Sequence, residues 1–239
     1  MSCPDIYQSL SFSSELSSPQ IQTILQLTSI FENSSKELQF NYAENINDGR
    51  GITFSFAGFC SGTGDGSQVI RKYNELTFNS DIQTIQYLKA LEKIDKEGKD
   101  LNPNVKGLDG FIQYINKIGK KPEFIQASLF IANNLYVVPS QKMADSLGLK
   151  LPLSKGQMYD SYINHGESGV KKMLKKAGSV KDDELTWLKN YLNIRLKVLS
   201  GDRTWKEAVD RVKVYQKLLT NPQLKSPFNV TCYGNSFKF

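Results

Sequence analysis

Two carboxylic acids, Glu32 and Asp48, are the side chains of this sequence best suited to acid–base chemistry, because their local settings differ. Ser18 is a suitable N-cap, and Pro19 suits a first helical turn, where its missing N–H loses no hydrogen bond. Apolar residues then recur at the spacing of a helix with one buried face, namely Ile21, Ile24, Leu25, Ile30 and Phe31. Glu32 would therefore lie at the negative end of a helix dipole and beside Phe31, and both influences disfavour ionisation. We interpret Glu32 as a proton donor.

Asp48 has the opposite surroundings. The run Asp-Gly-Arg-Gly at 48–51 predicts a tight turn, and Arg50 supplies a nearby positive charge that favours the carboxylate. Asp48 can therefore act as a general base. One acid and one base in contrasting environments are what hydrolysis of a glycosidic bond requires, and an inverting reaction places their carboxyl groups roughly 6.5–9.5 Å apart, with room for a water.

The residues after the turn predict a strand and a ligand-contacting loop. Apolar and hydroxyl side chains alternate over residues 52–56, which is typical of a half-buried strand. If the hydroxyl face lines a cleft, Thr53 can hold a water that Asp48 activates. The glycine-rich segment 58–66 would let the chain pass close to a ligand, with Asp65 as an acceptor for amines or hydroxyls.

Three blocks of this segment resemble the catalytic signature of the glycoside hydrolase family 46 chitosanases. They are Glu32-Asn33-Ser34-Ser35, then Asp48-Gly49-Arg50-Gly51 with Thr53, then Gly58-Phe59-Cys60-Ser61-Gly62-Thr63-Gly64-Asp65. Further matches follow in the same order, at Tyr136, the run from Met158 to Gly166, Arg195, Arg203, and the ending from Asn221 to Gly234. The similarity covers most of the chain from about residue 18 to residue 233.

The resemblance implies an inverting endo-hydrolase of β-1,4 bonds in chitosan, with a lysozyme-like fold. Glu32 matches the general acid, Asp48 the general base, and Thr53 the residue that positions the water. Substrate-binding positions are implied for Arg50, Asp65, Tyr42 and Tyr136, and an ion network that supports the acid for Asp160, Arg195 and Arg203. Phe40 stands where the family pattern suggests an aromatic hydroxyl.

Helix periodicity supports the ion network independently of the resemblance. In the helix expected over residues 183–199, Arg195 falls on the apolar stripe formed by Leu188, Leu192 and Leu199. A charge on a core face must be paired, and Asp160 in a separate helix is a suitable partner. The alternative is that Arg195 extends its guanidinium to solvent along the helix surface.

Element patterns predict an α+β protein that is mainly helical, with two lobes, a small β-sheet and a substrate cleft between the lobes. Further helices are expected near residues 82–94, 109–118, 122–133, 140–147, 155–165, 168–177, 183–199 and 204–219. We treat residues 1–239 as one domain, with a lobe that carries the catalytic segment over about 18–90 and a helical lobe over about 100–239. The polar segment 95–105 reads as a connection.

Composition limits the class of protein and its partners. No apolar stretch is long enough to span a membrane, and the N-terminus has neither a basic start nor an apolar run, so the chain as given shows no signal peptide. The family resemblance nevertheless implies secretion. Cys3, Cys60 and Cys232 can form at most one disulfide, and we expect Cys60 to be an unpaired packing thiol. We expect a monomer that binds chitosan or a partly acetylated glucosamine polymer, and no cofactor, metal, nucleic acid or membrane.

Charge is unevenly distributed along the chain. The net charge is +6, but residues 1–90 hold nine acids and five bases, while residues 91–239 hold fifteen acids and twenty-five bases. The catalytic segment is thus the acidic part, which suits a cationic polymer. We interpret the basic run at 171–176 as a solvated helix face.

Other functions remain open on these patterns. A muramidase or chitinase could share the fold, and a chitosan-binding protein without catalytic activity would need no separated acid and base. The lone histidine, His165, has no metal-ligand spacing around it, so a buried structural role is favoured. No Gly-Lys-Ser/Thr follows the glycine loop, which excludes a nucleotide P-loop there.

Overall fold

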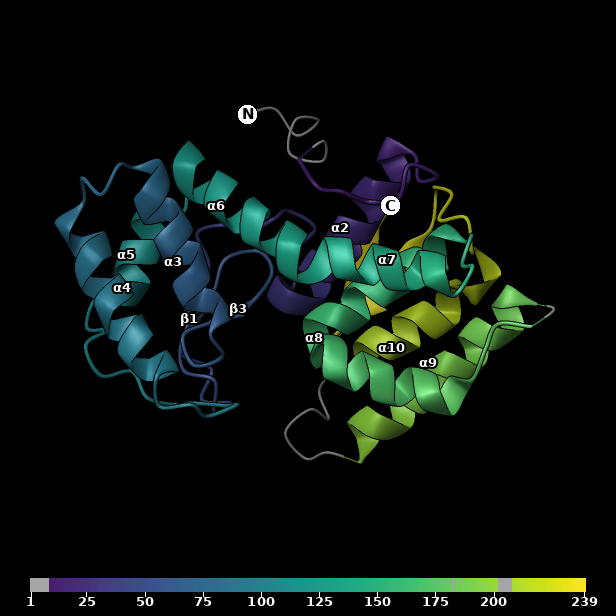
Figure 1. Cartoon of the computed structure of the whole chain (residues 1–239). Helices are drawn as coiled ribbons and strands as arrows, with labels where there is room; N and C mark the ends of the chain where they lie inside the picture. The colour runs from purple at the N-terminus through teal and green to yellow at the C-terminus, as the bar shows by residue number, and fades with distance from the viewer. Residues whose placement is uncertain (1–8, 182, 202–207) are drawn as a thin grey trace. The chain divides into compact units, whose positions relative to one another are not determined.

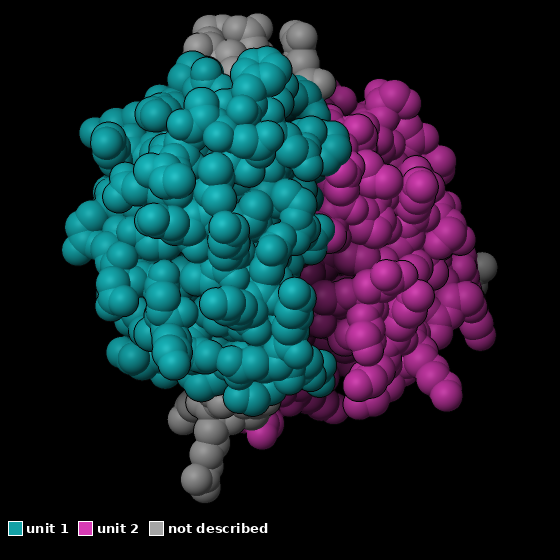
Figure 2. Space-filling view, turned by 60° about the vertical axis from the view of Figure 1, so that its left-hand side comes forward, with its two compact units in different colours: residues 1–9, 37–132 teal, residues 10–36, 133–239 magenta. Residues whose placement is uncertain are grey.

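The computed structural model describes residues 9–181, 183–201 and 208–239. Its chain divides into two compact units (Figure 2). Unit 1 contains residues 1–9 and 37–132, and unit 2 contains residues 10–36 and 133–239. The chain therefore passes from one unit to the other three times.

These units differ from the predicted lobes of 18–90 and 100–239. The helix that carries Glu32 belongs to the C-terminal unit, because its apolar face packs against a helix more than a hundred residues later in the sequence. The predicted connection at 95–105 is irregular chain after residue 95, but it joins two helices of unit 1 instead of the two units. Asn102 is buried there and its backbone N–H donates to the Gly62 carbonyl at 3.1 Å.

The described part of unit 1 combines a small antiparallel sheet with helices (Figure 1). The sheet has the order β1-β2-β3, with strands β1 Ala43–Glu44, β2 Thr53–Phe54 and β3 Phe59–Cys60. The helices are α3 Asp65–Leu76, α4 Ile82–Asp95, α5 Phe111–Ile118 and α6 Pro122–Ala132. Phe54 and Phe111 form an edge-to-face pair at 5.4 Å between ring centroids, and such aromatic contacts join the sheet to the helices.

The predicted half-buried strand is wrong in two respects. Only two residues, Thr53 and Phe54, pair as a strand, and both are buried. Ser55 has a positive φ of 62°, so the chain turns there instead of continuing as a strand. Residues 51–57 are all buried, and the alternation of apolar and hydroxyl side chains does not separate a core face from a solvent face. The sequence reading also missed α3, which begins at Asp65.

The described part of unit 2 is built from helices and a β-hairpin. Its helical elements are α2 Ser18–Asn33, the π-helix η1 Asn133–Val137, α7 Val138–Ser146, α8 Pro152–Ala177, α9 Glu184–Ser200, α10 Val209–Lys217 and the short η3 Leu218–Thr220. Strands β4 Asn229–Cys232 and β5 Asn235–Lys238 form an antiparallel hairpin. Helices α8, α9 and α10 lie side by side (Figure 1). No helix among the described residues is long and apolar enough to cross a membrane.

Two details of unit 2 correct the predicted helix ends. Ser17, rather than Ser18, is the N-cap of α2, and its backbone N–H donates to the Gln20 side chain at 2.9 Å. The helices predicted over 155–165 and 168–177 are the two parts of α8, which meet at a kink at Gly166, whose φ of 63° and ψ of 172° are not helical, but the first part begins at Pro152 rather than at residue 155.

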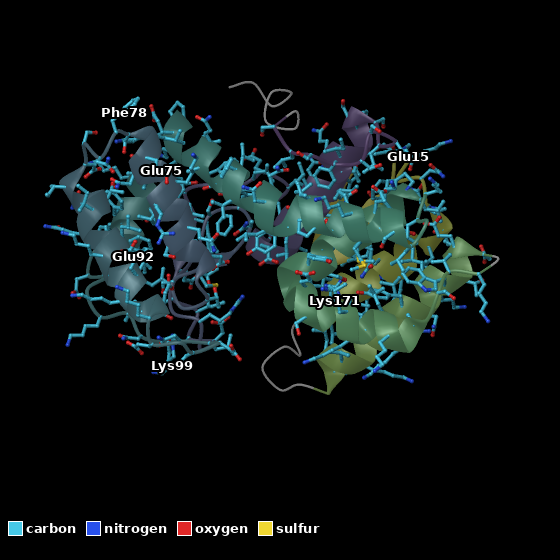
Figure 3. The ribbon with its side chains drawn as sticks, viewed as in Figure 1. Glu15, Glu75, Phe78, Glu92, Lys99 and Lys171 are labelled. Carbon is cyan, nitrogen blue, oxygen red and sulfur yellow. The ribbon has the colours of Figure 1, made fainter. Side chains whose placement is uncertain are left out.

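A buried lysine ties the N-terminal part of unit 2 to its helices. Lys155, on α8, has a fully buried side chain whose Nζ lies 2.9 Å from Asp145 on α7 and 2.9 Å from Glu15. It also donates to the hydroxyl of Ser13 at 2.7 Å. Figure 3 labels Glu15 at the edge of the unit, close to the start of α2. These contacts hold the segment before α2 in place.

Candidate active site

Glu32 lies in the last turn of α2, as the sequence predicts. The helix ends at Asn33, and Ser34 caps it in a left-handed conformation with its N–H bonded to the Ile30 carbonyl. The Glu32 side chain is only 15% exposed, and its Oε1 accepts a hydrogen bond from Nη2 of Arg211 at 2.7 Å. The helix end and Phe31 were the only neighbours of Glu32 that the sequence predicted, so the contact with Arg211 was missed.

Glu32 is the first member of a chain of four alternating charges within unit 2. The same Nη2 of Arg211 lies 2.6 Å from Oδ1 of Asp160, and Nη1 of Arg195 lies 2.6 Å from Oδ2 of Asp160. We call Glu32, Arg211, Asp160 and Arg195 the buried ion chain. Its members come from four helices, namely α2, α10, α8 and α9 in that order.

Burial shows why these charges must be paired. The side chains of Asp160 and Arg195 are fully buried and that of Arg211 is 4% exposed, so the alternative in which Arg195 reaches solvent is excluded. Burial by itself would raise the pKa of Asp160, but the charges of Arg211 and Arg195 outweigh it and hold the pKa below its usual value. Burial would lower the pKa of Arg211, yet Asp160 and Glu32 raise it well above the ordinary value.

Arg203, which the resemblance implies for the network, lies outside the described residues. Arg211, which the sequence analysis did not name, contacts both Glu32 and Asp160, and a signal for it exists in the sequence. Arg211 shares a helical stripe with Val214, Tyr215 and Leu218, all of which are buried. The stripe rule that singled out Arg195 would have found Arg211 as well.

Asp48 lies in unit 1, in the turn before β2, and Arg50 holds it in two ways. Its Oδ1 accepts from the Arg50 backbone N–H at 3.1 Å, and its Oδ2 accepts from Arg50 Nε at 2.7 Å and lies 2.6 Å from Nη2. The two side chains are 16% and 21% exposed respectively. This charge-assisted pairing fixes the orientation of the carboxylate.

Thr53 and Asp65 are both engaged in contacts within unit 1. The Thr53 hydroxyl is buried and lies 3.4 Å from the sulfur of Cys60. Oδ1 of Asp65 accepts from the backbone N–H groups of Cys60 and Gly66 and from the hydroxyl of Thr63 at 2.7 Å. Asp65 thereby links the end of β3 to the start of α3.

The glycines of the 58–66 loop serve close packing of the chain on itself. A Cβ on Gly62 would lie 1.8 Å from the Asn102 carbonyl oxygen, and one on Gly66 would lie 2.5 Å from the carbonyl oxygen of Cys60. Backbone contacts within unit 1 thus require these glycines.

Cys60 is free and buried, and burial raises the pKa of its thiol to about 12. It is a packing thiol, as expected, and Cys232 is also free and buried. Cys3 lies outside the described residues.

The remaining candidates lie in separate units. Tyr42 of unit 1 donates its hydroxyl to Glu44 at 3.1 Å. Phe40 is buried and packs on Phe56 with ring centroids 4.9 Å apart, a position in which a hydroxyl would need a partner. Tyr136 of unit 2 lies in the π-helix η1, a rare element that is frequent at functional sites.

Comparison with known proteins gives the family. The profile of Glycosyl hydrolase family 46 matches residues 26–228, which contain all of the candidate site residues. A chitosanase from Bacillus subtilis (strain 168) is 35% identical over 245 residues, covering 94% of this chain and 87% of the relative. A chitosanase from Streptomyces sp. (strain N174) is 28% identical and covers 89% of this chain and 79% of its own length.

Solved structures agree with this assignment. A complex of the Gynuella sunshinyii GH46 chitosanase with chitotetraose superposes with a TM-score of 0.86 at 32% identity, covering 93% of this chain and 98% of that one. A mutant chitosanase from Bacillus subtilis MY002 complexed with 6 GlcN gives a TM-score of 0.85 at 31% identity and covers 93% and 99%. The predicted mainly helical, lysozyme-like fold with small sheets is confirmed. The chain belongs to glycoside hydrolase family 46.

Proposed function

We propose that this chain is an endo-acting chitosanase that hydrolyses β-1,4 bonds in chitosan with inversion at the anomeric carbon. The observation that carries the proposal is the family match, because it spans both Glu32 and Asp48 and includes relatives named as chitosanases. Two similar structures hold chitotetraose and 6 GlcN, which supports a glucosamine polymer as substrate.

Each carboxyl group has one role in the proposed reaction. Glu32 donates its proton to the glycosidic oxygen as the bond from that oxygen to the anomeric carbon breaks. Asp48 accepts a proton from the water whose oxygen attacks the same carbon, so one water is consumed and both new chain ends are hydroxyls. Arg50 orients Asp48 through its three contacts, and Thr53 is the candidate for holding the water.

The other residues are proposed to support this chemistry. Asp65, Tyr42 and Tyr136 are candidates for binding the sugar units, and the buried ion chain holds the Glu32 carboxyl group in one orientation through Arg211. No cofactor enters the mechanism. We propose that the enzyme acts outside the cell, because the family resemblance implies secretion. We also propose that it acts as a monomer, and no nucleic-acid or membrane partner is needed for the reaction.

Substrate choice is the first test. The release of reducing ends should be measured from fully deacetylated chitosan, from chitin and from peptidoglycan. We expect rapid release from chitosan alone, with a fall in solution viscosity that precedes most of the release, because an endo-enzyme cuts within chains. Preferential release from peptidoglycan or chitin would favour a muramidase or chitinase, and binding without release would favour a non-catalytic protein.

The role of Glu32 predicts the behaviour of its amide variant. Glu32→Gln keeps the shape and a hydrogen-bond acceptor for Arg211 but removes the proton, so we expect kcat to fall roughly a hundredfold or more. Circular dichroism and a thermal melt should show that the variant is folded. Near-normal turnover by a folded Glu32→Gln protein would exclude this residue as the acid.

Inversion predicts the anomer of the first product. Because the water attacks from the face opposite the leaving group, a β-linked substrate should yield the α-anomer first. Proton NMR of the earliest time points, recorded before mutarotation equilibrates the sugars, can distinguish the two. An initial β-anomer would mean that Asp48 forms a covalent intermediate instead of activating water.

A further inference from the structure

The only histidine of the sequence, His165, contacts the far end of the buried ion chain. Nε of Arg195 donates a hydrogen bond to Nε2 of His165 at 3.1 Å, and Nη2 of Arg195 donates to Oδ1 of Asn164 at 3.1 Å. An arginine Nε–H can only donate. Nε2 of His165 must therefore carry no proton, which places the proton of the neutral ring on Nδ1.

The charges around His165 favour this neutral form. His165 is half-buried, and this partial burial together with Arg195 and Arg211 lowers the pKa of the imidazole to about 3, against a smaller opposite influence from Asp160. The next acid on the same helix, Glu167, follows the break in α8 and pairs at 2.7 Å with Lys171, which is labelled in Figure 3. The imidazole of His165 is thus neutral near pH 7, and its Nε2 accepts the hydrogen bond from Arg195.

The shape of α8 places this acceptor. Gly166 leaves the helical conformation immediately after His165, so Asn164 and His165 form the end of the first part of the helix. Asp160, one turn earlier on the same helix, faces the same guanidinium. Asp160, Asn164 and His165 of α8 therefore contact the fully buried Arg195, each at a different nitrogen.

Loss of the His165 acceptor would act on the whole ion chain. A buried guanidinium donor without a partner is costly, so Arg195 would shift to find a new one. Asp160 is shared between Arg195 and Arg211, and Arg211 is shared between Asp160 and Glu32. A shift of Arg195 thereby changes how firmly Arg211 holds Glu32.

We propose that His165, as a neutral hydrogen-bond acceptor protonated on Nδ1, is a positioning residue for the general acid and orients Glu32 through Arg195, Asp160 and Arg211. This inference rests on the proposed catalytic role of Glu32. It assigns the lone histidine a function in the reaction in addition to its structural place.

The ring state is tested by NMR on the untagged full chain. Because the sequence has one histidine, a long-range proton–nitrogen spectrum shows a single imidazole. We expect the proton on Nδ1 and no titration between pH 7 and pH 4. A ring protonated on Nε2, or one that titrates near the ordinary histidine pKa of about 6.5, would overturn the proposal.

Kinetics of two variants test the positioning role. His165→Leu removes the acceptor, and we expect kcat on chitosan to fall roughly ten- to hundredfold, the scale on which misplaced catalytic groups act, with little change in KM. His165→Gln keeps a neutral acceptor at a similar distance from the backbone and should restore most of kcat. The pH–rate profile of His165→Leu should also change on the limb that reports the acid.

Lys155→Met is the matched control, because Lys155 is a buried charged residue on the same helix with no contact to the ion chain. It should lower the melting temperature without changing kcat or the pH profile. If His165→Leu behaves in the same way, the histidine is only structural and the proposal fails. If the wild-type chain does not cleave chitosan, both this inference and the proposed function fail, whereas normal wild-type turnover with an unaffected His165→Leu variant rejects this inference alone.

Discussion

Two arginines on apolar helix stripes, Arg195 and Arg211, belong to the buried ion chain. Arg195 and Arg211 are both nearly or fully buried and share Asp160. Neither could remain in the core without that carboxylate, since an isolated buried charge is strongly destabilising. The position of Asp160 between two cations also explains why its pKa is held low despite complete burial.

A double-mutant cycle should reveal the coupling within the ion chain. Asp160→Ala leaves two arginines uncompensated, so we expect a loss of roughly 3–5 kcal/mol in the free energy of unfolding. Arg195→Ala should lose less than Asp160→Ala, because Arg211 still neutralises the carboxylate. Urea unfolding of both single variants and the double variant gives the interaction energy, and strictly additive losses would mean that the residues do not interact.

At the scale of elements, the close approach of α2 and α8 brings Glu32 and Asp160 into one network. Gly156 on α8 has no side chain at the point where Ile24 of α2 packs, and a Cβ there would lie 2.7 Å from Cγ1 of Ile24. Small residues at such a crossing set the distance between two helices. The spacing of Glu32 from Asp160 therefore depends on this contact, in which Gly156 lies one turn before Asp160 on α8 and Ile24 about two turns before Glu32 on α2.

Filling this contact should weaken the protein. Gly156→Ala introduces a methyl group into a packed interface, and we expect a loss of about 1–3 kcal/mol in the free energy of unfolding together with a lower kcat. Ile24→Ala is the matched partner variant, since it removes the atoms that the new methyl group meets. The double variant should lose less than the sum of the two single variants, and a stability of Gly156→Ala equal to that of the wild type would contradict the packing argument.

The short strands of unit 1 show why strands were harder to predict than helices. The hydroxyls of Thr53 and Ser55 alternate with aromatic residues, but all of them are buried. Alternation indicates a half-exposed strand only when one face meets solvent, and here hydrogen bonds inside the unit satisfy the hydroxyls, as between Ser55 and Ser128 at 3.1 Å. Helix α3 was missed because its glycine-rich start favours a loop interpretation.

At the scale of the whole molecule, charge is divided less sharply between the two units than between residues 1–90 and 91–239. Unit 1 contains thirteen acids against eleven lysines and arginines, whereas unit 2 contains eleven acids against nineteen. Glu32 therefore belongs to the basic unit and Asp48 to the slightly acidic one. The acidic segment 1–90 is thus divided between the two units, because α2 packs with a helix of unit 2.

Buried tyrosines and Lys155 predict how stability depends on alkaline pH. Burial raises the pKa of Tyr159 and of Tyr215. Burial by itself would lower the pKa of Lys155, but Glu15 and Asp145 outweigh it and raise that pKa. A raised folded-state pKa means that the folded chain holds its proton longer than the unfolded chain. The associated stability is thus complete below about pH 10 and is lost as the pH rises further.

Chemical denaturation from pH 8 to pH 12 measures this loss. The wild type should lose stability above about pH 10. Lys155→Met should be less stable than the wild type at pH 8, and the difference should shrink above the ordinary lysine pKa of 10.5, because the wild type then loses the contribution of the charged amine. A difference that stays constant to pH 12 would show that the Lys155 ion pairs contribute no stability.

The sequence by itself indicated the family and located many of the helices of this protein. The Glu32 and Asp48 blocks indicated the family, and apolar stripes located helices such as α4 and α9 within one or two residues. Periodicity suffices there because a helix that buries one face repeats its contacts every three to four residues. The same rule placed Arg195 in the core and required a partner for it.

Only the tertiary structure decided which residues share a unit and which groups complete the network. The grouping of residues 10–36 with 133–239, the place of Arg211 next to Glu32, and the hydrogen bond from Arg195 to His165 all join segments at least thirty residues apart in the sequence. No local pattern encodes such contacts, because they depend on how the apolar faces of α2, α8, α9 and α10 pack together. Charge pairing in the core then follows from that packing, since each buried charge is stable only where a neighbouring helix brings its partner.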